Sequence, residues 1–408
     1  MSIYQRSTFF RRPGKWHILL VLSLVSGVLL QQSGTVWAQG SPAKPAPDVI
    51  VFTNGDQLTG TLERADGDSF VFKSDIVGEI TVSADKIKEL HAGGKFVALK
   101  NGEKITRASK QPGTLTYGDN AITVTDTKSG TPEAVPVKDL AHLIDSATYD
   151  HEVTSNPGIW YGWNGSISGG ITLVESTQTG QTYNLAANLI RQVPTVAFLP
   201  PRTRSTINVL ETYGKITQPV IPQTTPPTPD TVAKTSIFHA DAEHDKYFTS
   251  KMYGLVGVSF DHNFAQGLNL QQIYGAGLGW TLIQTPVQQF DVKADVHYER
   301  QNFIPPIQVA NQPPAPATPS TNLVGSSFTE LYHRNLPRKI LFTETGTFIP
   351  AWNDSSAYSA IFGAGLQLPT YKRFSLNLSL LDNYLHQPAF GFKSNSLQFV
   401  TGVLYTLK

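Results

Sequence analysis

Two segments of the chain carry titratable side chains at every second position, the spacing that places side chains on one face of a β-strand. The first contains His239, Asp241 and Glu243. A histidine and two carboxylates that converge in this way could coordinate a metal ion. They could also form ion pairs and hydrogen bonds that satisfy the polar face of a sheet, with Lys293 as a partner. We expect this polar network rather than a metal site.

The second segment, Phe290–Glu299, alternates without a break. Its apolar face consists of Phe290, Val292, Ala294, Val296 and Tyr298. Its polar face carries charges of both signs, as expected where ion pairs form inside a polar lumen. The predicted lumen-facing network comprises His239, Asp241, Glu243, Asp291, Lys293, Asp295, His297 and Glu299.

Candidate catalytic groups are present without a motif that arranges them. Histidines occur at His262, His333 and His386, but no local pattern pairs one of them with a nucleophile. The chain has neither a P-loop nor a dinucleotide fingerprint. Because it contains 0 cysteines, thiolate nucleophiles, zinc–thiolate sites and disulfides are excluded. We predict no catalytic residues, no metal and no cofactor, with a membrane-embedded hydrolase as a remote alternative.

The composition indicates strands and argues against a nucleic-acid partner. The formal net charge of the 408 residues is +1, which provides no basic surface for nucleic acid. Only 15% of the residues are charged, whereas 33 are glycine and 10% are aromatic. Low charge with abundant glycine and aromatic residues is typical of many short strands rather than of helices.

From Trp160 onward, segments of roughly ten to sixteen residues alternate apolar and polar side chains. One of them, Tyr274–Leu282, has three glycines on its second face: Gly275, Gly277 and Gly279. About twelve such strands are expected, and both a soluble sandwich and a membrane barrel would show this alternation. The expected strands start near residues 158, 181, 202, 234, 251, 267, 287, 324, 339, 356, 373 and 395.

The lengths of the connections favour the membrane barrel. The long connections follow odd-numbered strands, at 213–233, 304–323, 350–355 and 386–394. The tight connections follow even-numbered strands, near Pro200, Thr249, Thr285, Leu336 and Tyr371. Outer-membrane barrels have short periplasmic turns and longer external loops, whereas a sandwich has no reason to obey this parity. We therefore predict an all-β fold, with a transmembrane antiparallel up-and-down β-barrel over residues 157–408.

Aromatic residues fall near the ends of the expected strands. Such positions suit the two aromatic girdles of a membrane barrel, where amphipathic rings lie at the level of the lipid headgroups. Rings that faced the lumen would instead suggest stacking platforms for a sugar. We favour the girdle, and its predicted members are Trp160, Tyr161, Trp163, Trp280, Tyr298, Trp352, Tyr384 and Tyr405.

The N-terminus has the three parts of a secretory signal. Basic residues precede the apolar run Ile18–Leu30, and the small-residue site Val36-Trp37-Ala38 follows it. The run is shorter than the roughly 20 apolar residues that span a bilayer, which disfavours the alternative of a membrane anchor. We predict a signal peptide at 1–38 and a Pro-rich linker at 39–48.

A small β domain is expected at 49–150, on the periplasmic side. Asn54-Gly55-Asp56 in its first half corresponds to Asn101-Gly102-Glu103 in its second, and Asn-Gly is a strong hairpin signal. Likewise Asp85-Lys86-Ile87 resembles Lys138-Asp139-Leu140. These repeats indicate two small SH3-like or LSm-like units packed together, and a single irregular β domain is the alternative.

Several short motifs together span most of the chain after the linker. They are Asn54-Gly55-Asp56, Leu58-Thr59-Gly60, Gly78–Val82, Trp160–Gly165, Gly169, Tyr274–Trp280 and Thr401–Thr406. In these motifs the chain resembles the YdiY-type family, described as putative salt-induced outer-membrane proteins and as a domain of unknown function. The resemblance implies a barrel fold and an outer-membrane location, and it transfers no catalytic or ligand residues. Such barrels usually end on an aromatic residue, whereas this chain ends in Leu407-Lys408.

Two classes of function remain open at this point. One is a non-enzymatic structural or envelope-stress barrel whose periplasmic domain binds another envelope component. The other is a narrow, porin-like diffusion channel for small solutes. The expected partners are outer-membrane lipid, the barrel-assembly machinery during insertion and a periplasmic envelope component. Nucleic acid is not expected as a partner.

Overall fold

The computed structural model describes residues 47–103, 110–155, 157–175, 179–218, 231–305 and 320–407. The predicted signal peptide and nearly all of the predicted linker lie outside these ranges. So do residues 219–230 and 306–319, which belong to two of the predicted long connections. Within the described ranges, no helix is both long enough and apolar enough to cross a membrane.

The N-terminal part is one sheet of nine strands. Its order is β4-β3-β2-β1-β5-β6-β7-β8, and β9 pairs with both β2 and β5. The strands are β1 (Asp48–Phe52), β2 (Gln57–Asp66), β3 (Ser69–Ser74), β4 (Gly78–Ser83), β5 (Ile87–Lys100), β6 (Gly113–Gly118), β7 (Ala121–Asp126), β8 (Pro132–Pro136) and β9 (Leu140–Asp145). Short 3₁₀ turns precede two of them, η1 (Ala84–Lys86) before β5 and η2 (Val137–Asp139) before β9.

The two halves of this sheet repeat one local structure and share one core. Thr53 N, directly before Asn54, donates to Lys86 O at 2.9 Å, and Asn101 N of the second Asn-Gly turn donates to Asp139 O at 2.8 Å. Both bonds tie an Asn-Gly turn to the 3₁₀ turn that precedes the last strand of its half. Buried apolar residues from both halves form a single cluster, which includes Phe70, Leu90, Leu115 and Leu143.

A short helix α1 (Ser146–Tyr149) and a π-helical turn η3 (Asp150–Thr154) follow β9. Asp145 caps α1, because its carboxylate accepts from Thr148 N at 2.9 Å.

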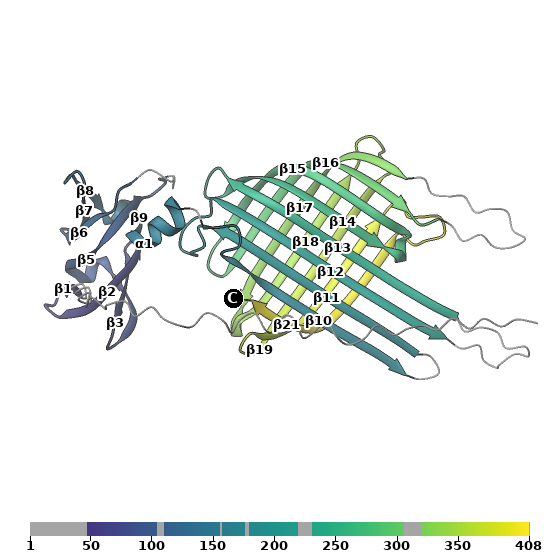
Figure 1. Ribbon diagram of the computed structural model, residues 1–408, viewed down its shortest axis with the longest axis horizontal. Helices are drawn as coiled ribbons and strands as arrows, with labels where there is room; N and C mark the ends of the chain where they lie inside the picture. The colour runs from purple at the N-terminus through teal and green to yellow at the C-terminus, as the bar shows by residue number, and fades with distance from the viewer. Residues whose placement is uncertain are drawn as a thin grey trace, which may run out of the picture. The chain divides into compact units, whose positions relative to one another are not determined.

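The rest of the chain forms a closed barrel of twelve antiparallel strands, β10–β21 (Figure 1). Each strand pairs with its neighbours in sequence, and β10 pairs with β21 to close the ring. The predicted barrel, its strand number and its up-and-down order are confirmed. The strands are β10 (Trp163–Glu175), β11 (Thr179–Val193), β12 (Thr203–Gln218), β13 (Thr231–Tyr247), β14 (Met252–Asn263), β15 (Leu268–Gln284), β16 (Gln288–Phe303), β17 (Thr321–Leu336), β18 (Ile340–Pro350), β19 (Tyr358–Tyr371), β20 (Phe374–Leu385) and β21 (Asn395–Leu407).

Contacts between non-neighbouring strands show which face of the barrel wall points inward. Lys293 on β16 meets Glu243 on β13, although β14 and β15 lie between these strands. Such a contact is possible only on the concave side, so residues on the same face as this pair line the lumen. Large apolar side chains are exposed on the opposite, outer face: Ile171, Leu185, Val256, Leu278, Val296, Phe328, Phe348, Phe362, Phe399 and Val403.

The described connections divide between the two rims of the barrel. The rim at which β10 begins and β21 ends is here called the turn rim, and the opposite one the loop rim. The turn rim has short connections at 248–251, 285–287 and 372–373, besides the 3₁₀ turn η5 (Pro337–Lys339). Its remaining connection, 194–202, is longer than the tight turn expected near Pro200. The loop rim includes 351–357, 386–394 and the 3₁₀ turn η4 (Phe264–Gln266).

Candidate functional site

All eight residues of the predicted polar network point into the lumen, from the inner faces of β13 and β16. They do not form one continuous cluster. They divide into three groups. One surrounds His239, one surrounds His297, and in the third Lys293 and Asp291 on β16 contact residues of β13 and β12.

The group around His239 links three adjacent strands. His239 Nδ1 lies 2.6 Å from Asp261 on β14, and its Nε2 lies 2.9 Å from Asp241. The Asn208 side chain on β12 donates to both carboxylate oxygens of Asp241, at 3.0 and 3.2 Å. Both nitrogens of the ring are thus engaged, and Glu243 pairs elsewhere. In the part of the chain that the structure describes, no group of such residues could hold a metal ion.

The Lys293–Glu243 pair crosses two strands of the wall. Lys293 Nζ lies 2.5 Å from a carboxylate oxygen of Glu243. The strand β15 leaves room for this contact because its inner face carries Gly275, Gly277 and Gly279. A Cβ on Gly279 would lie 2.2 Å from the ring of Tyr253, so only glycine admits that ring here. The glycine face that the sequence shows therefore has a packing role inside the lumen.

A second cross-lumen contact lies near the turn rim. Arg204 Nε on β12 bonds Asp245 at 2.6 Å, and its Nη1 lies 3.6 Å from Asp291 on β16. Its guanidinium also lies 4.8 Å from the ring centroid of Tyr253. All four side chains are more than nine-tenths buried. We call these four residues the Arg204 cluster.

Hydrogen bonding in the Arg204 cluster is incomplete among the described residues. Arg204 Nη2, Asp245 Oδ1, Asp291 Oδ1 and the Tyr253 hydroxyl are buried without a partner there. Buried charges are tolerated only when they are paired, so each member depends on the others.

The group around His297 ties β15, β16 and β17 together. His297 Nδ1 lies 2.8 Å from Asp295, which accepts from Ser327 N at 2.9 Å and from Ser327 Oγ at 2.7 Å. Glu299 accepts from the side-chain amide of Gln271. His297 and Glu299 are each 3% exposed, so this group fills the wall rather than facing open solvent.

The opposite part of the lumen has a neutral wall. None of the inward residues that the structure describes on β10, β11 and β18–β20 is charged. Most are small, hydroxyl-bearing or amide-bearing, and a few, such as Ile190 and Ile361, are apolar. Charge in the described lumen is therefore concentrated on β12–β16. Representative residues of the neutral wall are Ser168, Thr172, Asn188, Thr343, Gly365 and Asn377.

At the loop rim, a contact joins opposite sides of the ring. The Gln266 side chain in η4 donates to Asn383 O at 2.9 Å and to Ser394 O at 2.7 Å. Ala389 N donates back to Gln266 O at 3.1 Å. Because η4 joins β14 to β15 and residues 386–394 join β20 to β21, this contact lies across the mouth of the barrel.

The predicted girdle residues divide between the two rims. Trp160 and Tyr161 lie just before β10, and Trp163 is its first residue. Trp280 and Tyr405 lie near the ends of β15 and β21, so all five are toward the turn rim. Tyr298, Trp352 and Tyr384 lie toward the loop rim. Trp280, Tyr298 and Tyr405 are exposed on the outer face, as a girdle requires. The girdle itself stays a prediction.

Sequence reasoning missed several members of the lumen network. Asp245 continues the two-residue spacing of His239, Asp241 and Glu243, so the same pattern could have included it. Arg204 and Tyr253 give no comparable signal. Each lies on another strand and joins the cluster only through barrel closure.

Comparison with known families matches most of the barrel to one family model, described as a protein of unknown function, DUF481, over residues 212–407. This part of the chain is similar to that family. The expected resemblance to a domain of unknown function is thereby confirmed, while the narrower YdiY-type description stays a prediction. The DUF481 region begins within β12 and ends with β21, and Arg204 lies before it.

No curated protein matches the chain. Among solved structures, the chain is similar to the β domain of the Bordetella autotransporter Brka, with a TM-score of 0.28 and 10% identity. The match covers 60% of this chain and 97% of the other. At such values the likeness supports no argument about function.

Proposed function

We propose that this chain is a non-enzymatic β-barrel of the bacterial outer membrane with a structural or envelope-stress role. Its N-terminal domain would lie in the periplasm and bind another envelope component. The observation that carries the proposal is a pair of contacts between non-neighbouring strands on the inner face, the buried Arg204–Asp291 and the half-buried Lys293–Glu243. These contacts hold non-neighbouring strands together and occupy space inside the barrel, which favours a structural role over a wide pore.

The outer face supports insertion in a membrane. The strands run from 11 residues in β18 to 17 in β13 and β15, and a tilted membrane strand needs about 9–11. Large apolar side chains are exposed along this face, and soluble monomers rarely expose such continuous surfaces. Aromatic residues near both rims fit the two membrane interfaces.

The lumen contacts support a structural role. A barrel of about eight strands is filled by side chains and one of 16 to 18 leaves a channel, so side chains decide the case of twelve. Here, charged side chains meet across the lumen near the turn rim, and Gln266 reaches across at the loop rim. Both contacts narrow the path through the barrel.

A serine and a histidine meet on the outer face, but within the described ranges they lack the third group that a catalytic triad needs. Ser205 Oγ lies 2.8 Å from His244 Nδ1, both on the outer face. An activated serine needs a base that a third group orients. No carboxylate bonds the His244 ring among the described residues, so this pair lacks the third group. The lumen histidines His239 and His297 are already engaged with carboxylates.

The N-terminal sheet presents two unlike edges. The edge strand β8 begins and ends with proline, Pro132 and Pro136, and proline blocks strand pairing. The other edge strand, β4, has no proline, and the turn before it exposes Ile76 (91%) and Val77 (55%). This edge is the one suited to a partner. Because β10 begins at the turn rim, the domain is attached on the side of the short connections, which are periplasmic in outer-membrane barrels.

A narrow diffusion channel is the second candidate, and the neutral wall favours it. Thr172, Asn188 and Thr343 face the lumen and are exposed there. A path for small uncharged solutes would follow this wall, and the conductance of the purified protein separates the two candidates.

Epitope insertion tests location and orientation. An epitope inserted after Thr224 should bind antibody on intact cells, whereas one inserted after Asp119, in the β6–β7 turn, should bind only after the outer membrane is permeabilised. The reverse pattern would reject the orientation. Recovery of the protein in the soluble fraction would reject the membrane barrel.

A further inference from the structure

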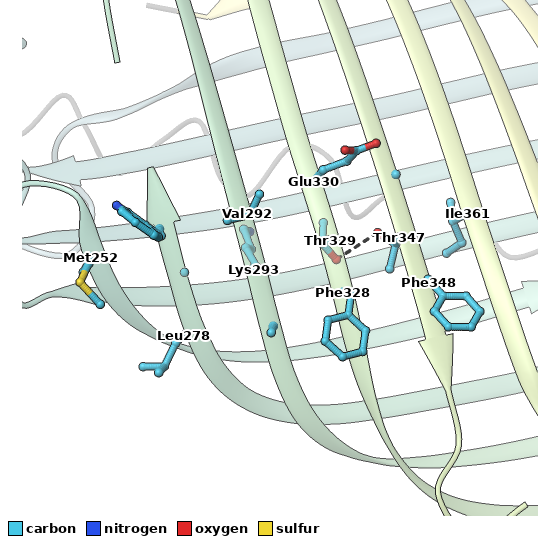
Figure 2. Close-up of a pocket in the computed structure, with 14 residues that line it drawn as sticks. Met252, Leu278, Val292, Lys293, Phe328, Thr329, Glu330, Thr347, Phe348 and Ile361 are labelled. Carbon is cyan, nitrogen blue, oxygen red and sulfur yellow. Dashed lines mark hydrogen bonds between the residues drawn. The ribbon is translucent and has the colours of Figure 1, made fainter. Parts of the chain in front are cut away.

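A groove lies on the outer surface of the barrel, centred on β15–β18 and bordered by β14 and β19. It has a volume of about 730 Å³ and is lined mainly by apolar side chains (Figure 2). Two rows of register-paired outer residues form it. One row is Trp280, Val292, Glu330 and Gly346, and the other is Leu278, Ala294, Phe328 and Phe348.

The groove arises from a sequence of large and small residues along each row. Ala294 lies between Leu278 and Phe328, and Gly346 follows Glu330, so the wall is lowest at the two small residues. The rings of Phe328 and Phe348 project beside this floor in Figure 2. On the inner side of the same strands, Thr329 and Thr347 share a hydrogen bond of 3.1 Å that holds β17 to β18.

Glu330 is the one carboxylate that lines the groove. A Cβ on Gly346 would lie 2.8 Å from its Oε1, so the carboxylate lies directly over the glycine. Its partners in register are Val292 and Gly346, which offer no side-chain donor. Lys293 also lines the groove, but its ammonium is engaged with Glu243 inside the lumen. Glu330 has no hydrogen bond or ion pair among the described residues.

A carboxylate on a lipid-facing surface is unfavourable unless a cation or donor meets it. The occupant must therefore supply a positive charge together with hydrocarbon that fills an apolar groove. We infer that the groove binds a phospholipid with a primary-amine headgroup, whose ammonium lies at Glu330 and whose acyl chain lies over Ala294 between the aromatic rings. This inference rests on the proposed membrane location.

Shape and position favour a lipid over a second barrel. A barrel wall is convex, so it would contact the raised rings of Trp280 and Phe328 and leave the floor at Ala294 unfilled. A stable protein interface also needs about 800 Å² per partner, more than a groove of this kind provides. Glu330 lies closer to the Leu336 end of β17 than to its Thr321 end, toward the turn rim and the headgroups of one leaflet.

Lipid retention by the full-length protein tests the inference. The protein is inserted into vesicles of equal phosphatidylethanolamine, phosphatidylcholine and phosphatidylglycerol with identical acyl chains, extracted gently, and examined by native mass spectrometry. We expect phosphatidylethanolamine to be retained roughly two- to fivefold over phosphatidylglycerol, the range that one exposed ion pair supports. Glu330→Gln should abolish this preference. Glu344→Gln, on the outer face of the adjacent strand β18, should keep it.

Occupancy of the floor is tested separately. Ala294→Leu should reduce the retention of all three lipids, whereas Ala276→Leu, an outer-face alanine of β15 outside the groove, should not. Insertion is verified for each variant by protection from protease. If the wild type fails to insert, the proposed membrane location is wrong. If it inserts but retains the three lipids equally, or if Glu330→Gln changes nothing, the lipid site is wrong. A dimer that Ala294→Leu abolishes would show that the groove is a protein interface and would overturn the inference.

Discussion

Arg204 is the side chain whose removal should destabilise the barrel most. In Arg204→Met, the carboxylates of Asp245 and Asp291 stay buried on the inner face while the guanidinium that meets both of them is gone. Removal of one partner from a buried ion pair costs about 3–5 kcal/mol, because an uncompensated charge remains. The packing of the arginine stem against Tyr253 is largely replaced by methionine, so most of the loss should be electrostatic.

The assay is equilibrium unfolding by guanidinium in lipid vesicles, followed by tryptophan fluorescence. Lys246→Met is a matched control, because Lys246 neighbours Asp245 on β13 but is exposed on the outer face. We expect it to change the free energy of unfolding by less than about 0.5 kcal/mol. The triple variant Arg204→Met, Asp245→Leu, Asp291→Leu should recover most of the lost stability, since no buried charge then lacks a partner. A loss below about 1 kcal/mol for Arg204→Met would refute the reasoning that this cluster holds the lumen together.

Three further predictions concern the two parts of the chain. Val296→Arg, on the outer face of β16, should cost about 2–4 kcal/mol near the bilayer midplane, whereas Thr345→Arg, on the neutral inner wall, should cost less; equal losses in lipid unfolding would refute the face assignment. A fragment of residues 40–150 should unfold cooperatively on its own, because its strands share one core, and a non-cooperative thermal transition by circular dichroism would contradict this. Burial alone would raise the pKa of Glu133, but hydrogen bonds from Lys100 and Lys110 outweigh it and lower the pKa. The carboxylate therefore stabilises the fold fully at pH values above its unfolded pKa, and this contribution is lost as the pH falls through its folded pKa. Glu133→Gln should therefore destabilise that fragment by less than about 1 kcal/mol at pH 7, and a difference that did not shrink as the pH fell from 7 to well below about 4 would contradict the ion-pair explanation.

Much of the barrel follows from local pattern, and the structure shows why. Alternation with a period of two fixes which residues share a face, as along Phe290–Glu299, and it needs no knowledge of the partner strands. The positions of most tight turns follow from the interruption of this pattern, whereas residues 194–202 form a longer connection than the tight turn expected near Pro200. The faces of β13 and β16, and so the placement of the predicted network in the lumen, could therefore be predicted.

Contacts across the lumen could not be predicted in the same way. Arg204 and Asp291 are far apart in sequence, and they meet only because barrel closure brings β12 and β16 within reach. The glycines of β15 were visible in the sequence, but the need for Gly279 depends on Tyr253, which comes from β14. Glu330 interrupts the apolar pattern of the outer face. The alternation of apolar and polar residues marks it as an exception but does not indicate which group it would contact.

The conductance of the purified full-length protein in planar bilayers tests the central claim most directly. With the lumen crossed by Arg204–Asp291 and Lys293–Glu243, the wild type should insert without stable conductance steps. The variant Arg204→Ala should then show steps or long open bursts, because the contact near the turn rim is lost. Stable, porin-like steps from the wild type would contradict the account and would establish the neutral wall as the path of a channel.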